Sequence, residues 1–177
     1  AANYDFTTYV LEKDPHCPAA HLCHHFTTGD ILDYDTVYQF GKQVDALTIE
    51  IEAVNVDALT QLEKEGVKIY PTPSAIRTIK NKIAQKQFYA DNEIPSAHFV
   101  ITDSAEAIRQ HIGLLPAVHK LAEGGYDGKG VQVIEDEKAI ALGFNAPAVL
   151  EEKVKIVKEL ALIVGMNTKG ETVIYPP

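Results

Sequence analysis

The spacing of apolar residues changes along the chain and predicts two kinds of architecture. In the first half, short apolar and β-branched runs alternate with segments in which apolar residues recur every three or four positions. The strand-like runs are 7–11, 26–31, 45–54 and 67–70, and the helical segments are 35–44, 56–64 and 74–92. Strands that alternate with helices predict a parallel sheet within an α/β domain.

The part after residue 94 has a different order of elements. Its predicted strands are 98–101, 115–118, 131–134 and 148–150, its predicted helices are 104–112 and 137–142, and 159–166 and 171–175 form a predicted antiparallel pair. This order predicts a smaller α+β unit built around a glycine-rich turn.

That turn lies in the stretch K-L-A-E-G-G-Y-D-G-K-G-V (120–131), which holds Gly124, Gly125, Gly128 and Gly130. Glycines let backbone N–H groups approach an anion, and Lys120 and Lys129 add positive charge, so the stretch suits the phosphates of a nucleotide. It is neither a Walker loop nor a dinucleotide fingerprint. An ordinary glycine hairpin remains the alternative reading.

Each of two charged segments allows two interpretations of its structural role. The period of two in 45–54 places Thr48, Glu50 and Glu52 on one face, which fits either a ligand crevice or a solvated edge. The segment 74–92 is a basic helix, either a solvated face or a source of one cation for a phosphate; its cations are Arg77, Lys80, Lys82 and Lys86.

The composition of the chain argues against several classes of protein function. The chain has 177 residues and a formal net charge of −9, which argues against nonspecific nucleic-acid binding. No apolar run reaches the length of a membrane span, no signal peptide is visible, and two cysteines make no disulfide framework, so we expect a cytoplasmic protein. Both ends look cut, so we expect a piece of a longer protein.

The segment 15–25 gathers both cysteines, Cys17 and Cys23, with several histidines. Their spacing fits no standard zinc pattern. We therefore expect a structural loop with a short helix here and assign no metal ligand.

Several stretches together resemble one family. They are D-A-L-T-I-E-I-E-A-V (45–54), Y-P-T-P-S-A-I (70–76), A-Q-K-Q-F (84–88), G-G-Y-D-G-K-G (124–130), L-E-E-K-V (150–154) and K-E-L-A-L-I-V (158–164). On these motifs the chain resembles the N5-carboxyaminoimidazole ribonucleotide synthetase family of ATP-grasp enzymes over essentially its whole length. The resemblance implies an α/β fold with a Rossmann-like, parallel-sheet pre-ATP-grasp domain (1–94), the small α+β lid subdomain of an ATP-grasp fold (95–154) and the start of its large subdomain (155–177).

The same resemblance implies an ATP site. Lys120 would meet the α- and β-phosphates, 125–131 would form a lid over them, 151–154 would lie at the adenine hinge, and Glu159 would bind the ribose hydroxyls. The implied ATP-binding residues are Lys82, Lys120, Gly125, Tyr126, Asp127, Gly128, Lys129, Gly130, Val131, Glu151, Glu152, Lys153, Val154 and Glu159. Glu52, and secondarily Glu50, would face the ribonucleotide.

The chain departs from the family pattern at three places. Lys82 stands where the family usually has arginine, which puts a forked contact in question. Val131 stands where the family usually has glutamine, and the stretch H-K-L-A-E around Lys120 replaces the more usual K-T-R-R.

The implied reaction transfers the γ-phosphoryl of ATP to bicarbonate, and the amine of aminoimidazole ribonucleotide then captures the carboxyl group from carboxyphosphate. Such chemistry needs positioning and charge neutralisation, and we name no catalytic side chain. The family also implies Mg²⁺, with ligands in parts outside these residues, and a homodimer. No nucleic-acid or membrane partner is expected.

Two alternatives remain open at this point. A formate-dependent glycinamide ribonucleotide transformylase, or another carboxylate–amine ligase of the superfamily, shares the E-I-E-A-V stretch (50–54) closely. A nucleotide-binding fragment without turnover, or simply an α/β domain with a glycine hairpin, belongs to a different class of function.

Overall fold

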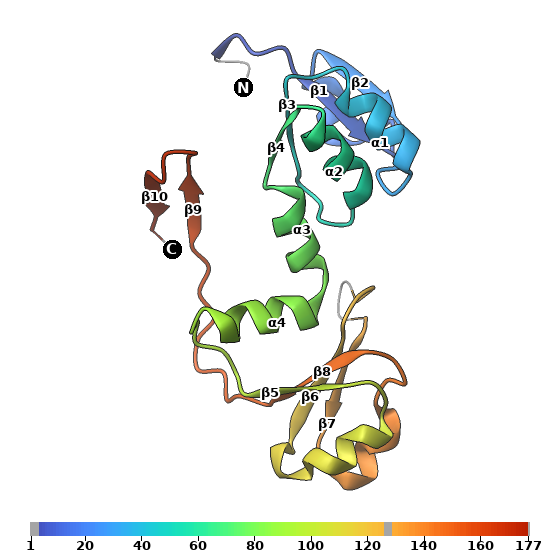
Figure 1. Cartoon of the computed structure of the whole chain (residues 1–177), viewed down its shortest axis with the longest axis vertical. Coiled ribbons are helices and arrows are strands. Elements are labelled where there is room, and N and C mark those ends of the chain that lie inside the picture. The colour runs from blue at the N-terminus through green and yellow to red at the C-terminus, as the bar shows by residue number, and fades with distance from the viewer. Residues whose placement is uncertain (1–3, 126–128, 177) are drawn as a thin grey trace.

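The computed structural model describes residues 4–125 and 129–176. Its first lobe contains the strands β1 (Tyr9–Glu12), β2 (His25–Thr28), β3 (Ala46–Thr48) and β4 (Lys68–Tyr70) and the helices η2 (Pro18–His21), α1 (Tyr34–Gly41) and α2 (Val56–Lys64). Figure 1 shows this lobe at one end of an elongated molecule, with α3 (Pro73–Lys80) leading away from it. The segment 15–25 is the expected loop with a short helix.

The strands of the first lobe form two parallel pairs. β1 pairs with β2, and β3 pairs with β4. Parallel pairing was expected, but the pairs are separate rather than one sheet. Residues of β1 and β3 line a shared cavity of about 660 Å³. Its lining is mostly apolar and includes Leu11 of β1 and Leu47 of β3.

Helices α1 and α2 cover these strands through apolar faces. Val37 and Phe40 of α1 pack with Leu59 and Leu62 of α2, and both leucines are fully buried. Burial of such side chains contributes roughly 1.5–3 kcal/mol each. Asn55 begins α2 by accepting a hydrogen bond from the backbone N–H of Ala58.

The strand predicted over 45–54 is much shorter in the structure. β3 ends at Thr48, and after a further hydrogen bond from Ile49 N–H to the Tyr70 carbonyl the chain leaves the ladder. The partner strand stops at the same place, because the residue after Tyr70 is Pro71, which has no N–H to donate.

The single helix predicted over 74–92 is two helices. α3 ends at Lys80, and α4 (Lys82–Asp91) begins after Asn81, whose backbone is extended at φ −110° and ψ 110°. The Asn81 side chain accepts hydrogen bonds from the N–H groups of Ile83 and Ala84, so asparagine competes with helical hydrogen bonding and restarts the helix in a new direction.

The second lobe is a four-stranded antiparallel sheet in the order β5-β8-β6-β7. Its strands are β5 (Phe99–Thr102), β6 (Ala117–Leu121), β7 (Val131–Ile134) and β8 (Ala148–Glu152). One face packs on η3 (Glu106–Leu114) and η4 (Glu137–Leu142) around buried Ile108, Ile134, Ile140 and Leu150. Figure 1 shows α4 on the opposite side of the sheet from these two helices.

The helices predicted over 104–112 and 137–142 are present as tighter 3-10 segments. Within η3, His111 leaves helical geometry at φ −129° and ψ 28°. Gly113 is a weak helix former, and Pro116 biases Leu115 to the extended backbone that is observed, so a regular α-helix is not sustained.

The last elements form the expected antiparallel pair. β9 (Ile163–Met166) pairs with β10 (Thr172–Tyr175) around the turn at residues 167–170, and every residue of both strands is exposed. Figure 1 shows this hairpin standing apart from the sheet of β5–β8. The mixed α/β architecture expected from the sequence is thus confirmed.

The described residues hold neither a membrane-spanning helix nor a cluster of metal-binding side chains. Within 4–125 and 129–176, no helix has the length and apolar character needed to cross a bilayer. Over the same ranges, no three His, Cys, Asp or Glu side chains are grouped so that they could hold a metal ion.

Candidate nucleotide-binding site

Lys120 projects from β6, one of the two inner strands of the antiparallel sheet. Its neighbours across the strands are Val131 of β7 and Val149 of β8. Side chains alternate along β6, so His119 enters the apolar core whereas Lys120 lies on the face that α4 covers. The Lys120 side chain keeps one third of its surface exposed, which leaves its ammonium group reachable from solvent.

Glu151 of β8 lies on the same face and pairs with two lysines. One carboxylate oxygen contacts the ammonium group of Lys120, and the other lies 2.5 Å from Nζ of Lys86 in α4. The Glu151 side chain is 8% exposed and that of Lys86 is 10% exposed. A carboxylate thus bridges a strand lysine and a helix lysine away from bulk water.

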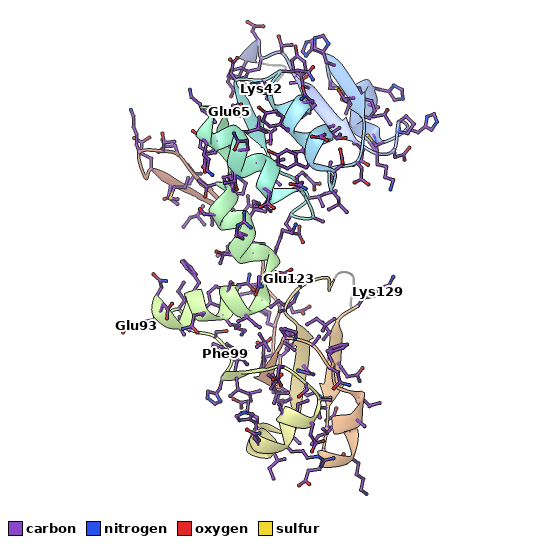
Figure 2. The ribbon with its side chains drawn as sticks, turned by 45° about the vertical axis from the view of Figure 1, so that its right-hand side comes forward. Lys42, Glu65, Glu93, Phe99, Glu123 and Lys129 are labelled. Atoms are coloured by element: carbon purple, nitrogen blue, oxygen red, sulfur yellow. The ribbon has the colours of Figure 1, made fainter. Side chains whose placement is uncertain are left out.

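Lys86 has two further contacts that fix its position. Its Nζ lies 2.6 Å from Oγ of Ser96 and 5.6 Å from the centre of the Phe99 ring. Figure 2 shows Phe99 on the side of α4 that faces the sheet. Because the ammonium group has an acid, a hydroxyl and an aromatic face around it, its burial is compensated.

A cavity of about 160 Å³ opens beside this cluster. Its lining combines three lysines with one carboxylate; the residues are Lys82, Gln85, Lys86, Tyr89, Lys120, Val149 and Glu151. The excess of positive charge over negative charge makes the cavity suited to an anion the size of a phosphate group.

The pKa of Glu151 depends on two opposing effects, burial of the carboxyl group and its contacts with two lysines. Burial by itself raises the pKa of this carboxyl, but the hydrogen bonds from Lys120 and Lys86 outweigh burial, and the pKa lies below its ordinary value of 4.5. Glu151 is therefore ionised at neutral pH, and the two lysines and Glu151 together carry one net positive charge.

The glycine hairpin begins directly after β6 and returns into β7. Gly124 and Gly130 have φ values of 75° and 76°, which L-residues with side chains rarely adopt. A Cβ on Gly130 would lie 2.8 Å from the Cα of Gly125, so the two arms approach too closely for other residues. The predicted ATP contacts Tyr126, Asp127 and Gly128 lie outside the described residues.

The base of the hairpin is tied to the start of α4. The backbone N–H of Lys82 donates to the Ala122 carbonyl at 2.8 Å, and Nδ2 of Asn81 donates to Oε1 of Glu123 at 2.8 Å. Figure 2 shows Glu123 near the first turn of α4 and Lys129 exposed on the other arm of the hairpin. The tie places Lys82 beside Lys120 in the lining of the cavity.

The remaining predicted hinge and ribose residues are not part of the cavity lining. Glu152 and Val154 are exposed, and Nζ of Lys153 lies 2.5 Å from Oε1 of Glu135. Glu159 is exposed in the segment between β8 and β9. Over 4–125 and 129–176, no hydrogen bond or ion pair joins Glu159 to Lys120, Lys86 or Glu151.

Glu52, the predicted ribonucleotide contact, belongs to the first lobe. It is exposed in the loop between β3 and α2, where its carbonyl accepts a hydrogen bond from Val54. Glu50 of the same stretch lines the larger cavity between β1 and β3, whereas Glu52 is not part of that lining.

Three residues on α4 line the cavity with Lys82, although the sequence did not assign them to the ATP site; they are Gln85, Lys86 and Tyr89. Lys86 is one of the four cations of the basic segment 74–92 for which a phosphate contact was an open alternative. The spacing 82, 85, 86 and 89 is that of one helical face, and this spacing was the signal available in the sequence.

His119 is a further residue that the sequence did not single out. Its Nε2 lies 2.8 Å from Oγ1 of Thr102, and its Nδ1 accepts a hydrogen bond from the backbone N–H of Phe144 at 3.2 Å. Burial lowers the pKa of His119 below its ordinary value of 6.5, so the ring is neutral and Nε2 carries the proton. His119 anchors β6 next to Lys120.

Two family models match successive parts of the chain. Residues 1–80 match the ribonucleotide synthetase preATP-grasp domain, and residues 87–177 match the ATP-grasp domain. The first match ends with α3 at Lys80, and the second begins within α4.

Known proteins resemble the chain over nearly all of its length. An N5-carboxyaminoimidazole ribonucleotide synthase of Synechococcus elongatus is 29% identical over 99% of this chain and 46% of its own length. The crystal structure of N5-carboxyaminoimidazole ribonucleotide synthetase from Thermotoga maritima is 31% identical with a TM-score of 0.87, and covers 99% of this chain and 47% of its own.

A third relative was solved with two ligands. The N5-carboxyaminoimidazole synthase from Aspergillus clavatus, in complex with ADP and 5-aminoimidazole ribonucleotide, is 28% identical with a TM-score of 0.82. The match covers 99% of this chain and 47% of that one. The chain therefore spans about half the length of the relatives that it matches.

Proposed function

The chain belongs to the ATP-grasp family, and on this premise we propose that its second lobe binds the phosphates of ATP through Lys120, Lys82 and the glycine hairpin. The observation that carries the proposal is the cavity beside Lys120, where three lysines face one carboxylate at the foot of the hairpin. Glycine backbone N–H groups and lysine ammonium groups are the usual partners of nucleotide phosphates.

We further propose that the longer protein carboxylates 5-aminoimidazole ribonucleotide. ATP would phosphorylate bicarbonate to give ADP and carboxyphosphate, and the exocyclic amine would attack the carboxyphosphate carbon and release inorganic phosphate. The relatives named for N5-carboxyaminoimidazole ribonucleotide synthesis support this reaction, and one of them was solved with ADP and the ribonucleotide. The reaction belongs to purine biosynthesis.

In this proposal the described residues bind and position rather than react. Lys120 and Lys82 neutralise phosphate charge, and the hairpin residues 125–131 cover the phosphates and keep water from carboxyphosphate. The hinge residues Glu151, Glu152, Lys153 and Val154 meet the adenine, and Glu159 meets the ribose. Glu159 is exposed in the segment after β8 and is not part of the cavity lining.

Several further expectations from the sequence are also proposals. We propose domain limits of 1–94, 95–154 and 155–177, a ribonucleotide contact at Glu52, a cytoplasmic location and a homodimer. Magnesium would accompany ATP, but the described residues do not fit a magnesium site, since Glu151 is occupied by two lysines and no other group of carboxylates converges there. We assign none of these residues to the metal.

Two measurements test the proposal, one for nucleotide binding by this chain and one for the reaction of the longer protein. Isothermal titration of MgATP into the 177-residue chain tests nucleotide binding, and we expect saturable binding that inorganic tripolyphosphate competes away. Phosphate release by the longer protein tests the reaction. We expect release that requires both bicarbonate and aminoimidazole ribonucleotide; release with formate and glycinamide ribonucleotide instead would establish the transformylase alternative.

A further inference from the structure

Lys86 lines the cavity beside Lys120, but its ammonium group is buried and already paired with Glu151. Its side chain is 10% exposed, and its Nζ is 2.5 Å from Glu151 and 2.6 Å from Ser96. A buried ion pair is often no more stabilising than two well-packed apolar side chains. The pairing of Lys86 therefore calls for a role beyond packing α4 on the sheet.

The geometry of Glu151 suggests that role. Its two oxygens are divided between two lysines, Oε1 with Lys120 and Oε2 with Lys86. If Lys86 were neutral, the full negative charge of a buried carboxylate would act on Lys120 alone. The ammonium group of Lys120 would then be held in a one-to-one ion pair, and a phosphate would have to compete with that pair.

We propose that Lys86 is a positioning residue, which shares the Glu151 carboxylate so that Lys120 stays fixed in place yet keeps a positive charge available for a phosphate group. The inference rests on the proposed ATP site and adds to it a residue that acts through Glu151. With Lys86, the cluster of two lysines and Glu151 carries one net positive charge. Without Lys86, the charges of Lys120 and Glu151 would cancel.

The first test compares affinities for MgATP by isothermal titration. Lys86→Met keeps the length and apolar character of the side chain and removes the charge, and we expect affinity to fall about tenfold or more, the size of a lost charged interaction. Lys138→Met, at an exposed lysine of η4 in the same lobe, is the matched control and should bind like the wild type.

A second substitution separates charge sharing from packing. Adding Glu151→Gln to Lys86→Met returns the cluster to one net positive charge, so we expect most of the lost affinity to return. A double variant that binds no better than Lys86→Met would show that the net charge of the cluster does not explain the loss. That outcome would overturn the proposal.

A third measurement does not depend on ATP. The rate at which an N-hydroxysuccinimide ester acylates Lys120, followed by mass spectrometry, reports how tightly its amine is held. We expect the rate to fall severalfold in Lys86→Met and not in Lys138→Met; an unchanged rate contradicts the proposal. If the wild type fails to bind ATP, the proposed function fails, while this rate still decides the role of Lys86.

The variant Glu151→Gln covers the case in which Lys86→Met does not fold, as judged by circular dichroism. Removing the carboxylate charge frees Lys120, so we expect acylation of Lys120 to become severalfold faster than in the wild type. An unchanged or slower rate in this variant would overturn the charge-sharing role.

Discussion

Asn81 Nδ2 donates a hydrogen bond of 2.8 Å to Oε1 of Glu123, which lies 42 residues further along the chain. The same asparagine begins α4 through its Oδ1, which accepts from the N–H groups of Ile83 and Ala84 at 3.0 Å. One side chain therefore fixes both the start of the helix that carries Lys82 and Lys86 and the base of the glycine hairpin.

Asn81→Asp should separate these two functions. Aspartate is as good an N-cap as asparagine, so we expect the free energy of unfolding to change little. The new carboxylate cannot donate to Glu123 and repels it, so we expect weaker MgATP binding as the hairpin base moves away from Lys82. Urea denaturation and isothermal titration measure the two effects.

Asn55→Ala serves as the control for the cap itself. Asn55 begins α2 in the first lobe in the same way, so its loss should cost about 1 kcal/mol of stability, as should Asn81→Ala. Only the Asn81 variants should alter affinity for the nucleotide. Equal affinities in Asn81→Asp and wild type would show that the contact with Glu123 does not organise the site.

Lys120→Ala should remove most of the affinity for ATP. It deletes one of the ammonium groups of the cavity lining, and a charged contact of this kind contributes about 1.5–3 kcal/mol, or roughly 10- to 100-fold in affinity. Isothermal titration beside Lys138→Ala checks the effect. Affinity within about twofold of the wild type would remove Lys120 from the site.

Gly130→Ala should destabilise the second lobe and weaken nucleotide binding. Gly130 has a φ of 76°, and a Cβ would lie 2.8 Å from the Cα of Gly125, so we expect a cost of about 2 kcal/mol or more. Gly113→Ala is the matched control, because nothing lies within 4 Å of its Cβ position. Its stability, from urea denaturation, should stay within about 1 kcal/mol of the wild type.

The stability of the protein should fall as the pH drops below 6.5, because His119 is then protonated in the unfolded state. Burial lowers the pKa of His119 below 6.5 in the folded protein, so the unfolded chain binds the proton first. The contribution is complete above pH 6.5 and is lost as the pH falls below that value.

Urea denaturation above and below pH 6.5 checks the sign. His119→Gln should flatten the dependence, whereas His16→Gln, at an exposed histidine, should keep the wild-type slope. Glu151 does not interfere, because its pKa is lowered from 4.5 and its contribution persists until the pH falls further. An identical slope in His119→Gln would assign the effect to another group.

Much of the fold followed from local patterns. The helical spacing of Val37 and Phe40 placed α1 correctly, and the glycines between two apolar runs gave the hairpin of β6 and β7. The patterns failed where a distant partner decides. The strand over 45–54 is cut short by Pro71 on its neighbour. The helix over 74–92 is broken at Asn81, which caps α4 locally and also donates a hydrogen bond to the distant Glu123.

By itself, the sequence determined the alternation of elements, the glycine-rich stretch that suits phosphates and the motifs of the ATP-grasp family. These depend on residue type and on spacing along a few turns or strands, which local backbone geometry fixes. The tertiary structure decided that Lys86 shares Glu151 with Lys120, because this contact needs α4 to pack on one face of β8. Such a burial of opposite charges arises from packing of segments distant along the chain, which neither segment encodes alone.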